Sequence, residues 1–273
     1  MTDTAGIPRA QRPRAPHRRS FAGGRAVFAL MLREMATSYG RSPGGYIWAV
    51  AEPVAGIAFM TVIFSLFFAS PPLGNSFALF YATGMMPFTI FTDMQGKTAG
   101  ALNYSRQLLA YPTVTFLDAL LARFVLTLIT QLLICYLVFG GAVLLFEGPV
   151  RTDLWPVLAG LLLSALLGFA IGSVNCYIFM KIPVWQLAWS VLMRPMFVIS
   201  GIFMVFDSVP QPYRDWLWWN PLVHVIGMLR RGFYESYRAD YASPAYVSLL
   251  SLGLLAIGLL LLRRHHRDLL ERN

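Results

Sequence analysis

The sequence predicts an all-α integral membrane protein whose helices cross a lipid bilayer six times. Hydrophobic residues make up 57% of the 273 residues and charged residues only 13%, about half of the charged share of soluble domains. The apolar residues also form long runs, and a helix needs about 20 such residues to cross the hydrocarbon core. The strands of a membrane barrel would show alternating segments of about ten residues instead, so we expect helices.

Six apolar runs are long enough for a crossing. The second and fifth contain charged residues and proline, which lower their hydropathy. In chain order, the predicted spans cover residues 46–70, 77–101, 116–146, 154–180, 184–206 and 246–262. An even number of crossings returns the chain to the side of the membrane on which it started.

Arginines set the expected orientation, because Lys and Arg accumulate on the cytoplasmic side of membrane proteins. Eight precede the first span and four follow the last: Arg9, Arg12, Arg14, Arg18, Arg19, Arg25, Arg33 and Arg41, then Arg263, Arg264, Arg267 and Arg272. Both termini are therefore expected in the cytoplasm. The loop 207–243 is then external, although it carries four arginines beside four acidic residues.

The remaining segments suggest a tail, a surface helix and a re-entrant region around one transmembrane domain, residues 24–273. Residues 1–23 contain prolines among arginines and predict a flexible basic cytoplasmic tail. Apolar side chains at helical spacing predict an amphipathic interfacial helix over 24–39. The connector 103–115 is expected in the cytoplasm. The tryptophan-rich region 207–243 contains an apolar stretch too short to cross, which favours short helices that dip in from outside.

Charged residues inside the spans are candidates for function, because each costs about 2.5 to 3.5 kcal/mol at the centre of a membrane helix. Asp93 and Lys97 are four residues apart and share a helix face, so they can neutralise each other. Arg194 precedes Pro195, which interrupts helical hydrogen bonding, and is the best candidate for a cation in a transport pathway. A structural pair or a position near the headgroups remains the alternative. The full set is Glu52, Asp93, Lys97, Asp118, Arg123 and Arg194.

Enzymatic chemistry is not indicated. Gly96-Lys97-Thr98 matches the end of a phosphate-binding loop, but the position of its first glycine is Phe91. The four histidines accompany no carboxylate cluster, so we expect neither catalytic residues nor a metal site.

Two segments carry a resemblance to a known family. Residues 39–53 read YGRSPGGYIWAVAEP, and Asn220-Pro221-Leu222 is followed by His224. Both resemble type-2 ABC exporter permeases of the polysaccharide export family, which export capsular polysaccharide, O-antigen or teichoic acid. There, a basic turn leads into a Gly-Tyr-x-Trp-x-x-x-x-Pro first span, and an N-P-L-x-H element lies in the last external loop. The residues matching the first element are Arg41, Gly45, Tyr46, Trp48, Glu52 and Pro53.

The resemblance implies half of a transporter in the bacterial inner membrane. Two copies of the chain would form the channel, and two copies of a separate subunit would bind ATP and Mg, so the chain itself needs no cofactor. The connector would dock in that ATPase through Asn103, Tyr104, Ser105, Arg106, Gln107, Leu108 and Tyr111. The path would follow the first and fifth spans, with Arg41, Tyr46, Trp48, Lys97, Arg123, Trp185, Trp189 and Arg194 as the candidate pathway residues.

The implied cargo is a lipid-linked, anionic capsular polysaccharide, since the external loops are short and the candidate pathway is cationic. A periplasmic or outer-membrane export component is a further candidate partner, and no nucleic acid is expected. The alternatives are an exporter of O-antigen, teichoic acid or a hydrophobic drug from the same family, a membrane-embedded enzyme, and an ion-coupled transporter. The glycan and its lipid anchor stay open.

Overall fold

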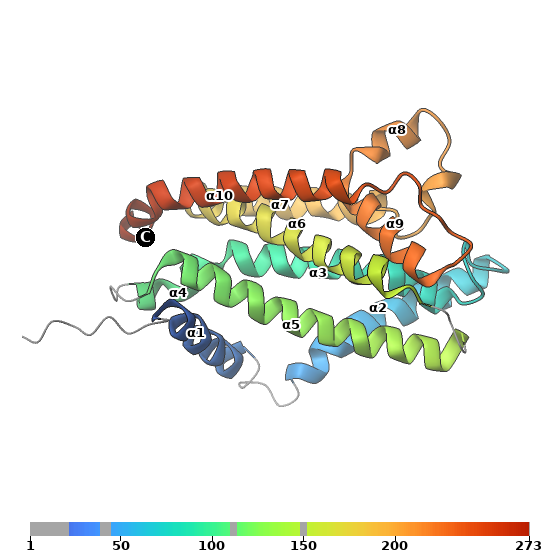
Figure 1. Cartoon of the computed structure of the whole chain (residues 1–273), viewed down its shortest axis with the longest axis horizontal. Helices are drawn as coiled ribbons and strands as arrows, with labels where there is room; N and C mark the ends of the chain where they lie inside the picture. Colours follow the sequence, from blue (N-terminus) through green and yellow to red (C-terminus); the bar gives the residue numbers. More distant parts are fainter. Residues whose placement is uncertain (1–21, 39–44, 110–113, 148–151, 273) are drawn as a thin grey trace, which may run out of the picture.

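The computed structural model describes residues 22–38, 45–109, 114–147 and 152–272, and these form a bundle of helices without strands (Figure 1). Residues 1–21, Arg41 and Tyr111 lie outside the described residues. The described elements are α1 (Ala22–Ser38), α2 (Gly45–Phe67), α3 (Phe77–Ala99), α4 (Ala101–Leu109), α5 (Phe116–Ala142), the π-helical η1 (Val143–Glu147), α6 (Leu154–Lys181), α7 (Val184–Ile199), the 3-10 helix η2 (Phe206–Ser208), α8 (Tyr213–Trp218), α9 (Pro221–Phe233) and α10 (Pro244–Arg272).

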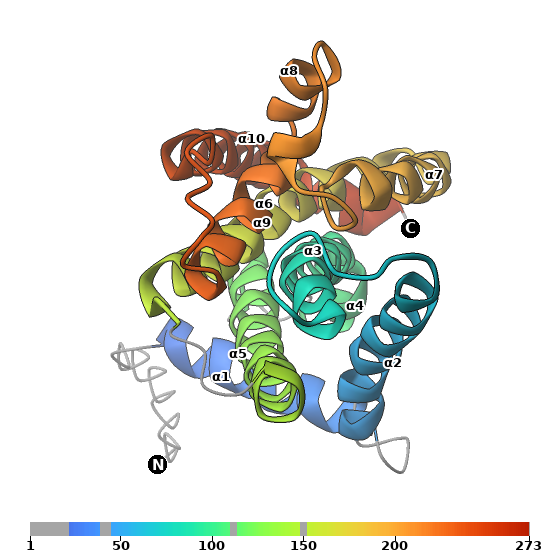
Figure 2. The same ribbon diagram turned by 90° about the vertical axis from the view of Figure 1, so that its right-hand side faces the viewer.

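The long helices run between two ends of the bundle (Figure 1). One end carries α1, α4 and the last turns of α10, and we call it the α1–α4 end. The other carries α8 and α9, and we call it the α8–α9 end. Figure 2 shows that α1 lies across the bundle, transverse to the long helices. Helix α1, the first described helix, is therefore a transverse helix at the α1–α4 end.

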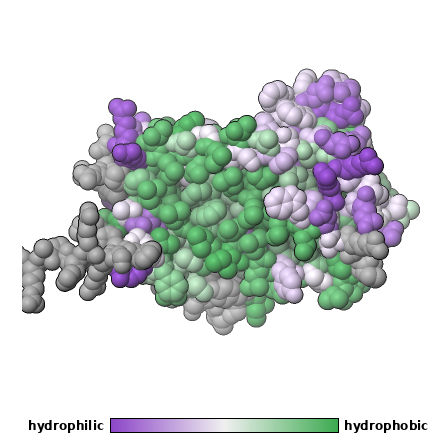
Figure 3. Space-filling view, viewed as in Figure 1, coloured by the Kyte–Doolittle hydropathy of each residue, from purple (hydrophilic) through white to green (hydrophobic). Residues whose placement is uncertain are grey.

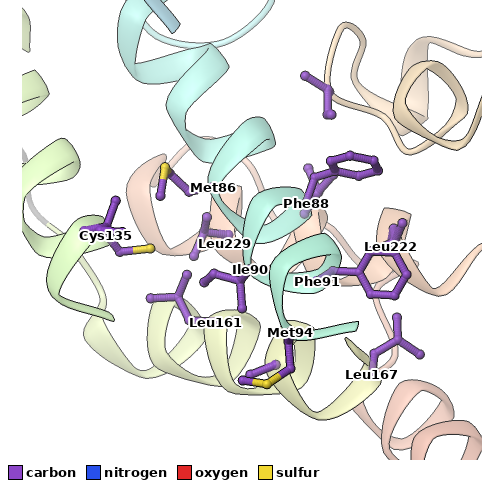
Figure 4. Packing of buried hydrophobic residues seen from close by; sticks show 14 of the residues in the cluster. Met86, Phe88, Ile90, Phe91, Met94, Cys135, Leu161, Leu167, Leu222 and Leu229 are labelled. Carbon is purple, nitrogen blue, oxygen red and sulfur yellow. The ribbon is translucent and has the colours of Figure 1, made fainter. Parts of the chain in front are cut away.

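The centre of the bundle is the contact between α3 and α6. Two glycines of α6 allow this contact. A Cβ at Gly168 would lie 2.6 Å from the carbonyl oxygen of Phe91, and one at Gly172 would lie 2.7 Å from Cβ of Thr98. Small residues bring helix backbones close in membrane proteins. Around this contact, buried side chains of α3, α5, α6 and α9 form the core shown in Figure 4, including Met86, Ile90, Phe91, Met94, Cys135, Leu161, Leu167 and Leu229.

Four of the described helices are long and apolar enough to cross a membrane: Ile47–Phe67 in α2, Phe116–Leu145 in α5 and η1, Leu154–Lys181 in α6, and Pro244–His265 in α10. Figure 3 shows a broad apolar band with polar surface toward the two ends. The protein is therefore an integral membrane protein, as predicted. The remaining two predicted spans correspond to α3, which has more polar residues, and to the shorter apolar helix α7.

Several predicted boundaries differ from the structure. The fifth span was expected to reach residue 206, but α7 ends at Ile199 because the chain turns at Gly201, whose φ of +90° favours glycine. The last helix begins at Pro244 and continues into the basic tail to Arg272. The third run stays helical but changes to π-helix after Ala142.

The glycine contact between α3 and α6 gives a test of the packing. Replacing Gly168 with alanine puts a methyl group against the Phe91 carbonyl, and overpacking of this kind lowers the free energy of unfolding by about 1 to 3 kcal/mol. Gly140→Ala is the matched control, since a Cβ there meets no atom within 4 Å and alanine favours a helix. Thermal unfolding in detergent should separate them. Equal midpoints would contradict the proposed role of the glycine.

Candidate functional site

Helix α4 presents a polar face at the α1–α4 end. Ala101, Leu102 and Ser105 are buried, whereas Asn103 and Gln107, one helical turn apart, are exposed. The other predicted coupling residues in α4 are Tyr104, which is exposed, and Arg106 and Leu108, which are half-buried. The short helix thus offers a polar surface beyond the apolar band.

Five of the eight predicted pathway residues, Tyr46, Trp48, Trp185, Trp189 and Arg194, lie on α2 and α7, two long helices that the rest of the bundle covers little. Trp48 of α2 is 69% exposed. Helix α7 has no buried residue, and Arg194 on it is exposed. In Figure 2, α2 and α7 both lie to the right of α3, with α7 above α2. Tyr46 is the second residue of α2, and its side chain lies outside the described part of the structure.

The first turns of α7 are attached to α6 by a tryptophan. The indole N–H of Trp185 donates to Oδ1 of Asn175 over 3.2 Å. The rings of Trp185 and Trp189 lie 6.2 Å apart. The indole nitrogen of Trp189 is buried and has no hydrogen-bond partner among the described residues. Two of the predicted pathway residues therefore sit together at the corner between α6 and α7.

The charged residues of α3 and α5 lie in polar contacts between helices. Gln131 of α5 donates to Oδ2 of Asp93, and the charges of Lys97 and Glu52 both act on Asp93. Lys97 is half-buried in the last turn of α3. Arg123 is 8% exposed and forms an ion pair with Glu34 of α1.

Asp118, another predicted intramembrane charge, has a local role at the start of α5. Its carboxylate accepts hydrogen bonds from the backbone N–H and the hydroxyl of Thr115, and the Thr115 hydroxyl accepts from the Asp118 backbone N–H. This reciprocal arrangement is a capping box, which pairs backbone donors that a helix start leaves free. Asp118 thus stabilises the helix end.

The N-P-L-x-H element builds the start of α9. The Asn220 side chain accepts from the backbone N–H of Leu222 over 3.0 Å, and its amide nitrogen donates to the carbonyl oxygen of Ile199 over 3.0 Å. Pro221 occupies the first turn, where a missing N–H costs nothing. Asn220 therefore caps α9 and fixes it to the end of α7.

His224 joins α8 to the segment before α10. The backbone N–H of Ser243 donates to its Nδ1 over 3.1 Å, and its Nε2 lies 2.6 Å from the carbonyl oxygen of Trp218. A backbone N–H only donates and a carbonyl only accepts, so the ring is neutral with its proton on Nε2. The rings of Trp218, Tyr241 and Tyr246 surround it. Burial lowers the pKa of His224.

Arg230 is a fully buried cation at the same end. Its Nη1 and Nη2 donate to the carbonyl oxygens of Met204 and Ile202, each over 2.8 Å. Its guanidinium lies 4.2 Å from the centroid of the Phe80 ring. Arg230 thereby attaches the turn after α7 to α9 and α3.

Comparison with known protein families now identifies the chain. The sequence profile described as ABC-2 type transporter matches residues 25–234, from α1 to the end of α9. The chain belongs to the ABC-2 type transporter family. This confirms the resemblance carried by residues 39–53 and by the N-P-L-x-H element, because both lie inside the match.

Several curated proteins are similar to this ABC-2 chain over nearly their whole length. The polysialic acid transport protein KpsM of Escherichia coli is 29% identical over 244 residues, which cover 89% of this chain and 95% of KpsM. The capsule polysaccharide export inner-membrane protein CtrC of Neisseria meningitidis is 25% identical, with 88% and 91% covered. BexB of Haemophilus influenzae, which has the same description, is 24% identical, with 90% and 93% covered.

The sequence analysis of this ABC-2 chain did not select Glu34, His224 or Arg230 as site residues. Glu34 falls among polar positions of α1, and its partner Arg123 is distant in sequence, so no local pattern reveals the pair. His224 was noted only as part of a motif. Asn220 and Pro221, which precede His224, form a helix-start signal that would have indicated the beginning of α9.

The two hydrogen bonds of His224 predict a pH-dependent stability. The neutral ring is favoured in the folded protein, so the stabilisation is present above the ordinary histidine pKa of about 6.5 and is lost as the pH falls below it. Replacing His224 with phenylalanine leaves the Trp218 carbonyl and Ser243 N–H unpaired, at about 1 to 3 kcal/mol for each buried group. Both effects can be measured as the unfolding temperatures of the wild type and of His224→Phe, taken at intervals of about one pH unit around the ordinary histidine pKa.

His224→Gln serves as the comparison for that measurement, because its amide keeps one donor and one acceptor. We expect His224→Gln to unfold at an intermediate temperature and, like His224→Phe, to lose the pH dependence. A variant that keeps the wild-type dependence on pH would show that another group titrates.

Proposed function

We propose that this chain is the membrane-spanning subunit of an ATP-driven exporter that moves lipid-linked capsular polysaccharide from the cytoplasm across the bacterial inner membrane. The observation that carries the proposal is the similarity to KpsM, CtrC and BexB, which extends over 91 to 95% of their lengths. Their printed descriptions are polysialic acid transport and capsule polysaccharide export. A similarity of this extent includes the elements at both ends of the bundle.

The topology that we propose has six crossings, with both termini in the cytoplasm. Helix α3 supplies one crossing in spite of its polar residues, because Gln95 and Thr98 are buried against the protein and do not face lipid. Helix α7 supplies another; its 16 residues reach about 24 Å, somewhat less than the core of about 30 Å. The α1–α4 end is then cytoplasmic, and α8 and α9 dip in from the periplasm.

Two copies of the chain and two copies of an ATP-binding subunit make up the proposed exporter. ATP and Mg²⁺ bind to that second subunit, which contacts the exposed face of α4. The cargo passes along α2 and α7, the helices with the least coverage in one copy. There, Trp48, Trp185 and Trp189 offer ring faces to sugars, and Arg194 offers a charge to acidic groups.

The contact of α4 with an ATPase is tested by purifying the tagged chain from its native membrane. We expect an ATP-binding subunit in about equal amount and ATP hydrolysis by the complex. The double variant Asn103→Arg, Gln107→Arg should recover about tenfold less of that subunit, the loss that corresponds to about 1.4 kcal/mol of binding free energy.

The matched control for this purification is Asn75→Arg, an exposed substitution in the loop between α2 and α3 at the α8–α9 end (Figure 1). It should leave recovery of the ATP-binding subunit unchanged. A wild-type chain that purifies alone, or that takes up substrate in vesicles on an ion gradient without ATP, would contradict the proposed function and support an ion-coupled transporter.

The charge of Arg194 is tested by reversing it. Because the side chain is exposed on α7, Arg194→Glu should leave the unfolding temperature unchanged. Surface polysaccharide should decrease on the order of tenfold, which corresponds to about 1.4 kcal/mol of lost attraction for an anionic cargo. Arg194→Lys keeps the charge and should export near the wild-type rate. Normal export by a stably expressed Arg194→Glu would remove this residue from the pathway.

A further inference from the structure

One arginine contacts three other elements at the α1–α4 end. Arg123 lies two turns from the start of α5, and its Nε is 3.2 Å from Oε1 of Glu34 in α1. Its Nη1 donates to the carbonyl oxygen of Lys97 in the last turn of α3 over 3.2 Å. Its guanidinium carbon is 4.2 Å from the centroid of the Tyr104 ring in α4. A single side chain therefore joins α5 to α1, α3 and α4.

The attachment of α1 depends on few side chains. The helix packs mainly on α5, and Leu30 and Glu34 are its buried residues. Phe28, Leu32 and Met35 are exposed, which suits a helix at a membrane surface. The ion pair of Glu34 with Arg123 is consequently one of the few buried contacts that hold α1 on the bundle.

Helix α4 is connected to α1 as well as to α5. The hydroxyl groups of Tyr104 and Thr37 form a hydrogen bond, while the Tyr104 ring lies under the Arg123 guanidinium. We call the set Glu34, Thr37, Tyr104 and Arg123 the α1–α4–α5 junction. Its members come from all three helices, so a displacement of α4 within an intact junction also displaces α1 and α5.

Burying the charges of Glu34 and Arg123 at the junction costs desolvation free energy. Burial raises the pKa of the Glu34 carboxyl, and the charges of Arg123 and Lys97 offset only part of that rise. Well-packed apolar residues are often as stabilising as a buried ion pair. The ion pair instead specifies which side chains meet, because either charge would be left buried without a partner in another arrangement of the helices.

We propose that Arg123 is a positioning residue that holds α1, α4 and α5 as one unit, so that movement of an ATP-binding subunit against α4 reaches the membrane-spanning helices. This inference rests on the proposed function. It gives Arg123 a role at the junction in place of contact with the cargo. When the junction is broken, α4 moves without α5, and ATP hydrolysis continues while export per ATP falls.

The test uses the full complex of this chain with its ATP-binding subunit. ATP hydrolysis is measured in nanodiscs, and export is measured as surface polysaccharide in cells that lack their own copy of the chain. In Arg123→Gln with Glu34→Gln, no buried charge is left unpaired. We expect assembly and ATP hydrolysis within about twofold of wild type, and export per ATP lower on the order of tenfold, within the usual range of coupling between sites.

Tyr104 allows the junction to be tested without replacing a buried charge. The residue is 41% exposed, so Tyr104→Leu should fold, and it should show the same loss of export per ATP. Tyr104→Phe keeps the ring under Arg123 and should lose less. Arg33→Gln is the control, since it removes an exposed cation next to Glu34 on α1 and should behave as wild type.

The outcomes separate the two proposals. If hydrolysis and export fall in the same proportion in the junction variants, or if neither falls, the positioning role is wrong while the proposed function stands. If the wild-type chain neither binds an ATP-binding subunit nor exports polysaccharide, both proposals are wrong. If the variant with Arg123→Gln and Glu34→Gln does not accumulate, the ratio of export to ATP hydrolysis in Tyr104→Leu decides whether the junction has the positioning role.

Discussion

A lipid bilayer provides no hydrogen-bond partner, and this constraint determines where the polar side chains of the bundle lie. Helix α3 shows the result. Gln95 and Thr98 are buried against neighbouring helices, and Asp93 accepts a hydrogen bond from Gln131 of α5. The polar groups are turned inward and connect one helix to the next, and the surface in contact with lipid stays apolar (Figure 3).

The same constraint explains why a buried arginine joins several elements at each end of the bundle. A guanidinium group has five donors in a rigid plane, so it pairs with several carbonyl oxygens or with a carboxylate at once. Arg230 holds the turn after α7 through two carbonyls, and Arg123 holds Glu34 and the end of α3. Each buried arginine thus binds backbone carbonyls at or just after the end of a helix.

The sequence predicted those features that depend on local composition. Long apolar runs gave the long helices, and residues 39–53 with the N-P-L-x-H element indicated the family. The predicted end of the fifth span was wrong. The turn after α7 depends on the positive φ of Gly201 and on the Ile202 carbonyl that Arg230 binds, and neither feature alters the hydropathy of the sequence. The burial of Glu34 was not predicted, because it depends on Arg123, which lies in another helix. The assignment of pathway residues to a cargo stays a prediction.

Helix α7 has no buried residue, and it is attached near its two ends, through Trp185 to Asn175 and through the Ile199 carbonyl to Asn220. Substitutions at its exposed positions, such as Leu187 and Val191, therefore change what the helix presents to its surroundings without changing the core between α3 and α6, whereas Met193, Met196 and Phe197 pack against that core. Selection acts on these two sets of residues separately. Related sequences can therefore diverge at the exposed positions of α7 while keeping one scaffold, because mutations there carry little penalty for folding.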